Sequence, residues 1–133
     1  MDAADLRRHA LAARQFGVAV GADGVSVTLT EPTRLQMQLA LLEAIGASDA
    51  PRMDAAAKLR YRRLELLRAV TGWSGVRERH LAPEAPTDEP VPFDAGLVEL
   101  LLDAQPEWED AISSALVERA GKRAQALEKA AKN

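Results

Sequence analysis

The chain contains no cysteine among its 133 residues, and aromatic residues make up only 4% of it. The lack of cysteine excludes disulfide scaffolds, thiol catalysis and cysteine-ligated metals. Few aromatics beside many Ala, Leu and Val favour helices over a β-sandwich. No apolar run approaches the roughly 20 residues of a membrane span, and the first residues lack the apolar core of a signal peptide. We therefore expect a soluble, cytoplasmic protein with no membrane partner.

Hydrophobic periodicity predicts one mainly α-helical domain over residues 1–133, with four to five helices and one amino-terminal β-hairpin. The expected parts are a helix over 1–15, the hairpin over 16–30, a helical pair over 33–71, a proline-rich loop over 77–93 and a helical pair over 94–130. Strict alternation over 25–30 and the Asp23-Gly24 step indicate the hairpin. Because a lone hairpin is marginal in water, we expect it to lie on the helices or to pair with another chain, which would give a homo-oligomer.

Local signals place the ends of the helices. Thr33 and Gln36 have the spacing of a capping box. Apolar residues then follow helical spacing up to Gly46, namely Leu35, Leu39, Leu42 and Ile45. The next helix is expected to begin near Pro51 and to run to about Val70, with residues 71–76 ending it. In the last helix, Trp108 shares an apolar stripe with Ile112 and Leu116, which predicts a core position.

Charge is unevenly distributed along the chain. Residues 52–80 carry eight Lys or Arg and three acids, whereas residues 84–110 carry nine acids and no base. Our interpretation is that the two segments pair with each other inside one fold. The alternative is that they form an interaction surface.

The sequence offers little that could perform chemistry. The two histidines, His9 and His80, lack the spacing of a zinc site, and surface positions without metal are expected for both. No Gly-x-Ser-x-Gly nucleophile motif and no phosphate-binding glycine loop is present. The acidic residues near Glu107 are explained by the dipole at the start of a helix. We predict that the chain is not an enzyme and uses no cofactor.

Binding to protein is the remaining interpretation. The basic residues of 58–68 lie among leucines and are typical of the solvated side of an amphipathic helix, so nucleic acid is not the expected partner. Tryptophan is enriched at interaction hot spots. Trp73 lies at the end of a helix beside two glycines, and the proline-rich segment is flanked by further apolar residues. The predicted protein-binding residues are Trp73, Val76 and Phe93.

Three stretches together resemble the tail assembly chaperones of long-tailed bacteriophages. They are a strand and a Pro-Thr step into a helix over 25–34, a helix closing on Val-Thr-Gly-Trp-Ser-Gly-Val over 70–76, and Glu-Pro-Val-Pro-Phe-Asp over 89–94 before two carboxy-terminal helices. The resemblance covers residues 25–133. The family often has Gly before Pro-Val-Pro-Phe and Ser after it, where this chain has Glu89 and Asp94. Asp94 still serves as a helix cap.

The resemblance implies a non-enzymatic chaperone that binds the long helical tape measure protein in the host bacterial cytoplasm until the tail tube protein polymerises around it. Two alternatives stay open. One is a small acidic inhibitor from a phage or mobile element, which would use residues 84–110 to mimic nucleic acid and block a host nucleic-acid-binding enzyme. The other is a nucleic-acid-binding protein that uses the basic helix.

Overall fold

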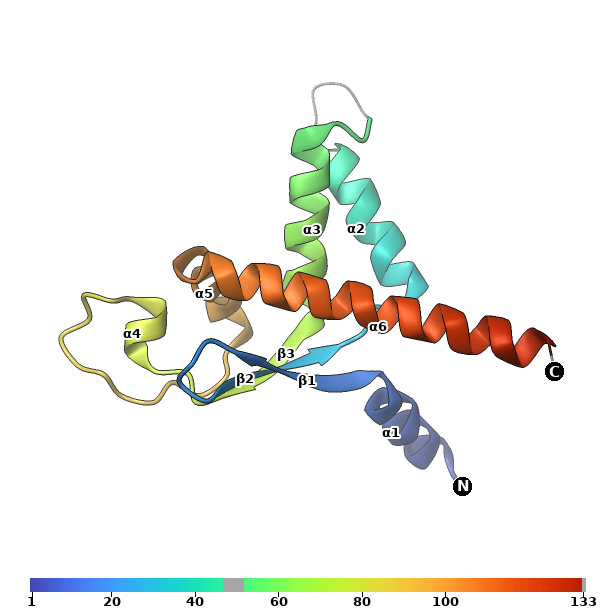
Figure 1. The fold of residues 1–133 in the computed structure, drawn as a ribbon, viewed down its shortest axis with the longest axis horizontal. Coiled ribbons are helices and arrows are strands. Elements are labelled where there is room, and N and C mark those ends of the chain that lie inside the picture. Colours follow the sequence, from blue (N-terminus) through green and yellow to red (C-terminus); the bar gives the residue numbers. More distant parts are fainter. Residues whose placement is uncertain (47–51, 133) are drawn as a thin grey trace.

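The computed structural model describes residues 1–46 and 52–132, and within these it is mainly helical, with six α-helices and a small antiparallel sheet (Figure 1). In chain order the elements are α1 (Ala3–Arg14), β1 (Gln15–Val20), β2 (Val25–Thr30), α2 (Arg34–Gly46), α3 (Ala55–Ala69), β3 (Val70–Ser74), α4 (Glu78–Leu81), the 3₁₀ helix η1 (Ala95–Leu97), α5 (Val98–Ala104) and α6 (Pro106–Lys132). The prediction of a mainly helical fold with an amino-terminal hairpin is confirmed.

The hairpin forms as the alternating pattern indicates. β1 and β2 pair in regular antiparallel register from Gln15↔Thr30 to Val20↔Val25. Gly21 and Gly24 take positive φ angles of 65° and 75° in the connecting turn, a conformation that glycine adopts without steric cost. The turn between the two strands therefore has the residues that its backbone requires.

A third strand replaces the expected end of a helix. Residues 71–76 were predicted only to end the preceding helix, but Val70–Ser74 form β3, which pairs with β2 in the order β1-β2-β3. Gly72 allows this close pairing, because a Cβ there would lie 3.3 Å from the Cβ of Thr28. The hairpin is thus not the only β element. It is stabilised by a strand distant in sequence as well as by helices.

The core lies between one face of the sheet and helices α3, α5 and α6. Phe16, Val18 and Val20 lie opposite Leu29, Val27 and Val25, so their side chains share that face. The buried cluster joins the strands to side chains of the three helices, including Leu66, Leu101, Leu102, Trp108, Ile112 and Leu116. The predicted core position of Trp108 is confirmed.

Helices α2 and α3 form a hairpin that projects from this core (Figure 1). The predicted capping box begins α2: the Thr33 amide donates to Gln36 Oε1 at 2.8 Å, and the Gln36 amide donates to Thr33 Oγ1 at 3.1 Å. The predicted start of the next helix near Pro51 is wrong, since α3 begins at Ala55 and is capped by Asp54. Pro51 itself lies outside the described residues.

The proline-rich segment 77–93 is more ordered than its composition predicts. It begins with the short helix α4, and Glu78 of that helix fastens the following residues. Glu78 Oε1 accepts hydrogen bonds from the Thr87 hydroxyl at 2.6 Å and from the Glu89 amide at 2.7 Å. These bonds, the one from Thr87 first, hold the pKa of the Glu78 carboxyl below its usual range. Side chain–backbone bonds replace regular secondary structure here.

Two leucines of α3 offer a matched test of the core. Leu66 is fully buried, whereas Leu59 is 69% exposed on the same helix. We expect Leu66→Ala to lower the free energy of unfolding by about 2–5 kcal/mol, because it removes a core side chain and leaves a cavity. Leu59→Ala should change it by no more than about 0.5 kcal/mol. Urea unfolding monitored by circular dichroism measures both, and equal effects would contradict the described core.

Candidate protein-binding surface

The three residues predicted to bind protein lie close together beside β3. The indole Nε1 of Trp73 donates to the Val91 carbonyl at 2.8 Å, and the rings of Trp73 and Phe93 meet edge to face with centroids 5.0 Å apart. The Val91 amide donates to the Val76 carbonyl at 2.8 Å. Val76 is only 2% exposed, and its side chain packs in the core. These contacts fasten residues 90–93 to β3, and binding of a partner there stays a prediction.

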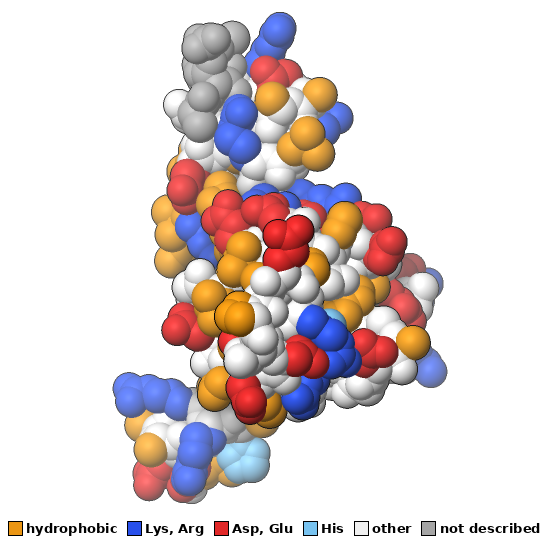
Figure 2. All heavy atoms as spheres, turned by 90° about the vertical axis from the view of Figure 1, so that its left-hand side faces the viewer, with side chains coloured by type: hydrophobic (Ala, Val, Ile, Leu, Met, Phe, Trp, Pro, Cys, Tyr) orange, Lys and Arg blue, Asp and Glu red, His pale blue; other side chains and the backbone are white. Residues whose placement is uncertain are grey.

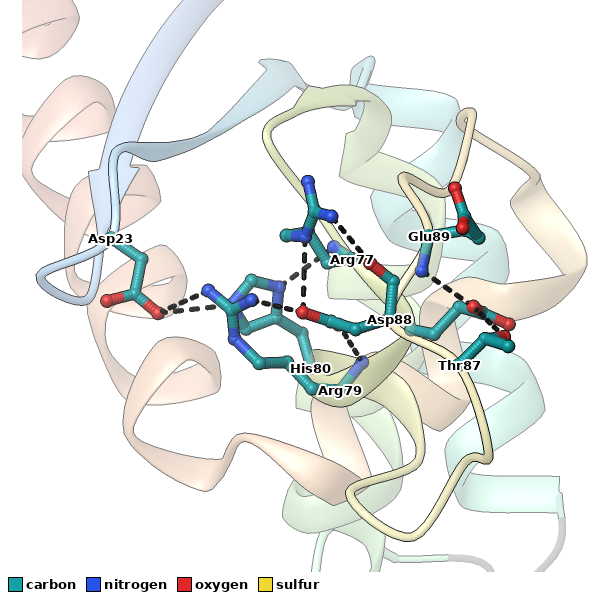
Figure 3. Close-up of polar contacts among 8 residues, drawn as sticks. Asp23, Arg77, Arg79, His80, Thr87, Asp88 and Glu89 are labelled. Carbon is teal, nitrogen blue, oxygen red and sulfur yellow. Dashed lines mark hydrogen bonds and ion pairs between the residues drawn. The ribbon is translucent and has the colours of Figure 1, made fainter.

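A cluster of ion pairs holds the same loop from its other side (Figure 3). Asp88 accepts from the Arg79 amide at 3.1 Å and pairs with the guanidinium groups of Arg79 at 2.5 Å and Arg77 at 3.3 Å. The Arg79 amide is the largest of the influences that lower the pKa of the Asp88 carboxyl, and the two guanidinium groups add to it. Asp88 therefore stabilises the loop in its ionised form.

His80 connects this cluster to the hairpin turn. Its Nδ1 accepts the Arg77 amide at 2.9 Å, so the ring hydrogen is on Nε2, which lies 3.3 Å from Asp23 Oδ2. The bond to His80, followed by that to Arg79, lowers the pKa of Asp23. The prediction of a surface position is wrong for His80, which is buried with its ring centroid 5.1 Å from that of Trp108. His9 is exposed.

The basic and acidic segments pair with each other, as we interpreted from the sequence. Arg63 contacts Asp103 at 2.8 Å and binds Glu109 through two nitrogens at 3.2 and 3.1 Å. Arg62 contacts Asp110 at 2.6 Å. Bonds to Glu109 and then Asp103 raise the pKa of the Arg63 guanidinium. Figure 2 accordingly shows basic and acidic side chains side by side over this end of the molecule.

The apolar stripe of α2 faces solvent, which the sequence did not indicate. Leu35, Leu39 and Leu42 have i, i+4, i+7 spacing and are 63%, 50% and 66% exposed. The two buried residues of the helix are Ala40 and Ala44, which lie on its opposite side. The small alanines let α2 pack closely on α3, and the leucines are left without a partner in the described residues. The missed signal is that α2 carries large apolar residues on more than one side.

An open groove of about 420 Å³ lies between α2, α3 and α6. Its lining includes Met37 of α2 and Leu116, Val117 and Leu127 of α6 together with four charged residues, Glu31, Arg34, Glu65 and Arg123. Beyond Leu116, no described residue of α6 is buried, and the helix runs past the body of the molecule (Figure 1). The leucine stripe of α2 offers apolar surface with the i, i+4, i+7 spacing of helix recognition, whereas the groove lies on another side of the same helix.

Comparison of the chain with protein-family models, with curated proteins and with solved structures found no match. Among residues 1–46 and 52–132, no group of three or more His, Asp or Glu is placed to hold a metal ion. In the same part of the chain, no helix has the length and apolar character needed to cross a membrane.

The ion pairs of Asp88 predict a pH-dependent contribution to stability. Because the pKa of Asp88 is lowered by folding, its ionised form stabilises the fold at neutral pH, and this contribution is lost as the pH falls through the folded-state pKa. Thermal melts should find Asp88→Asn less stable than the unmodified chain at neutral pH and equal to it in acid. In hydrogen exchange, the Arg79 amide should lose protection.

Glu84→Gln is the matched control, because Glu84 is an exposed carboxylate of the same loop with no ion pair in the described residues. It should leave both the melting temperature and the exchange of the Arg79 amide unchanged. A stability difference between Asp88→Asn and the unmodified chain that persisted in acid would contradict the assigned role of Asp88.

Proposed function

We propose that this chain is a non-enzymatic chaperone of phage tail morphogenesis, which binds the tape measure protein and keeps it soluble before the tail tube protein polymerises around it. The single observation that carries the proposal is the solvent-facing stripe of Leu35, Leu39 and Leu42 on a helix that projects from the core. The family resemblance over residues 25–133 supplies the identity of the partner and the host cytoplasm as the location.

The chemistry of the stripe fits such a partner. A long amphipathic helix must keep its apolar side covered until its final neighbours replace the cover. Leucines at i, i+4, i+7 on α2 can pack along one such helix. Short contacts repeated along a long partner give avidity while each single contact remains weak enough to exchange.

The internal ion pairs favour this proposal over an acidic inhibitor. Five of the nine acids in residues 84–110 are already paired with arginines of the same chain, namely Asp88, Glu99, Asp103, Glu109 and Asp110. A surface that mimics nucleic acid needs its negative charges directed at the partner. The same pairing occupies Arg62 and Arg63 of the basic helix, which lowers its ability to bind phosphates.

The test is co-expression with the tape measure protein of the same genome, followed by affinity purification at about 0.15 M and about 0.5 M salt. We expect a complex that persists at both salt concentrations, because apolar contacts are not screened. Leu39→Asp should weaken it at least about tenfold, since it removes a leucine contact and places a charge in the interface. The matched control is Gln125→Asp, which adds the same charge at an exposed position of α6, away from the stripe.

The outcomes distinguish a wrong function from a wrong binding surface. Absence of a complex, with the tape measure protein still insoluble, would exclude the proposed function. A complex that Leu39→Asp does not weaken would show that the α2 stripe is not the binding surface. Trp73→Ala tests the surface predicted from the sequence. If Trp73→Ala abolished binding and Leu39→Asp did not, the binding surface would be the one formed by Trp73, Val76 and Phe93.

A further inference from the structure

The two edge strands of the sheet, β3 and β1, differ in whether another segment of the chain bonds to their outer side. Beside β3, residues 90–93 cover the edge through the bond from Trp73 to Val91, the bond from Val91 to Val76 and a bridge between Arg77 and Pro90. Beside β1, α6 flanks part of the strand, with Arg119 over the Phe16 ring, but no described segment pairs with its outer backbone groups. Within residues 1–46 and 52–132, the backbone of 16–20 makes hydrogen bonds only to β2.

β1 also lacks the features that usually prevent an open edge from pairing with another chain. Natural edge strands are protected by charged residues, by proline, by a β-bulge or by being very short. β1 has the sequence Gln-Phe-Gly-Val-Ala-Val, with neither charge nor proline, and its register with β2 is regular over six pairs. The one irregularity of the sheet lies between β2 and β3, at Thr28 and Leu29.

We propose that β1 is a dimerisation strand, which pairs antiparallel with β1 of a second copy of this chain about a two-fold axis. This pairing satisfies the outward backbone groups of both strands and joins the two sheets into one. A two-fold interface brings the same surface of each copy together, so a charged strand would repel itself, and β1 is uncharged. The interface is separate from the leucine stripe of α2, so the inference does not depend on the proposed function.

The surroundings of β1 suit the approach of a second strand. Gly17 and Ala19 are exposed on the uncovered face of the sheet and have the smallest side chains of the strand. A shallow hollow beside Phe16, Gly17 and Val18 is flanked by α6, which contributes Glu118, Arg119 and Lys122. Each of these charges is already paired within the chain, Lys122 with Glu118 and Arg119 with Glu31, so they do not impose a single sign of charge on the approach of a second copy.

Single cysteines test the pairing directly, because the natural chain has none. Gly17→Cys, Ala19→Cys and the control Ser74→Cys place one thiol on β1 or on the covered edge strand β3. The substitution at Gly17 is tolerated, since a Cβ there meets only Ser26 Oγ, at 3.6 Å. Under mild oxidation, we expect a disulfide-linked dimer from position 17 or 19, depending on the register, and none from position 74.

A charge variant measures the strength of the same contact. Sedimentation velocity over a dilution series should give a monomer–dimer equilibrium for the unmodified chain. Ala19→Lys should raise the dissociation constant at least about tenfold, because it places like charges opposite each other across the two-fold axis. Ser74→Lys, on the other edge strand and also exposed, should leave the constant unchanged. Amide exchange of 16–20 should slow with rising protein concentration.

Three results would overturn the inference. The first is a chain that stays monomeric at every concentration. The second is a dimer that Ala19→Lys does not weaken, or assemblies that grow beyond two copies, because a two-fold pairing closes at a dimer. The third is protection of 16–20 that appears only when another protein is added, which would assign the edge to a strand of that protein. None of these measurements uses the tape measure protein, so the inference and the proposed function fail independently.

Discussion

The structure depends on the packing of one face of a three-stranded sheet against α3, α5 and α6. The three strands cannot persist alone, and α3, α5 and α6 bury their large apolar side chains against them. Leu29, Leu66 and Ile112 come from a strand and from two helices far apart in sequence, and all are fully buried.

The small size of that cluster determines what is left outside it. Among the described helices, α3, α4, α5 and the first half of α6 contribute large side chains to it, while α2 contacts α3 through alanines. Large apolar residues of α2 therefore remain in water, where they contribute nothing to folding. A group of such residues on one helix is best explained by a partner that covers them.

Local sequence signals predicted the elements that local interactions decide. The capping box of Thr33 and Gln36, the glycines of the hairpin turn and the Asp94 cap all depend on residues at most three positions apart, and all form as expected. β3 was missed because Val70–Ser74 becomes a strand only by pairing with β2. No periodicity within five residues can specify a pairing with so distant a segment.

In the candidate site, too, the sequence indicated which residues are large and apolar but not which contacts they make in the fold. Trp73 and Phe93 were recognised as large apolar residues beside a loop, but their contact with each other arises only when the loop returns to β3. The leucines of α2 were recognised as a helical stripe, yet the sequence does not say which side of a helix faces its neighbour. Alanines lie on the other side, and close packing of helices selects small residues as readily as large ones. The sequence alone could not decide whether the leucine side or the alanine side of α2 packs on α3.

The use of charge inside the fold determines which interactions remain for partners. Arginines of α3 and of the segment after β3 neutralise five of the nine acids of residues 84–110, so the two most charged regions of the chain partly satisfy each other. Among the unpartnered surfaces of the described residues are an apolar helix side and an uncharged strand edge. Apolar contact and backbone hydrogen bonds are weakly affected by salt, whereas exposed ion pairs are screened. The paired charges thus stabilise the fold, and binding to partners is left to apolar side chains and to backbone groups.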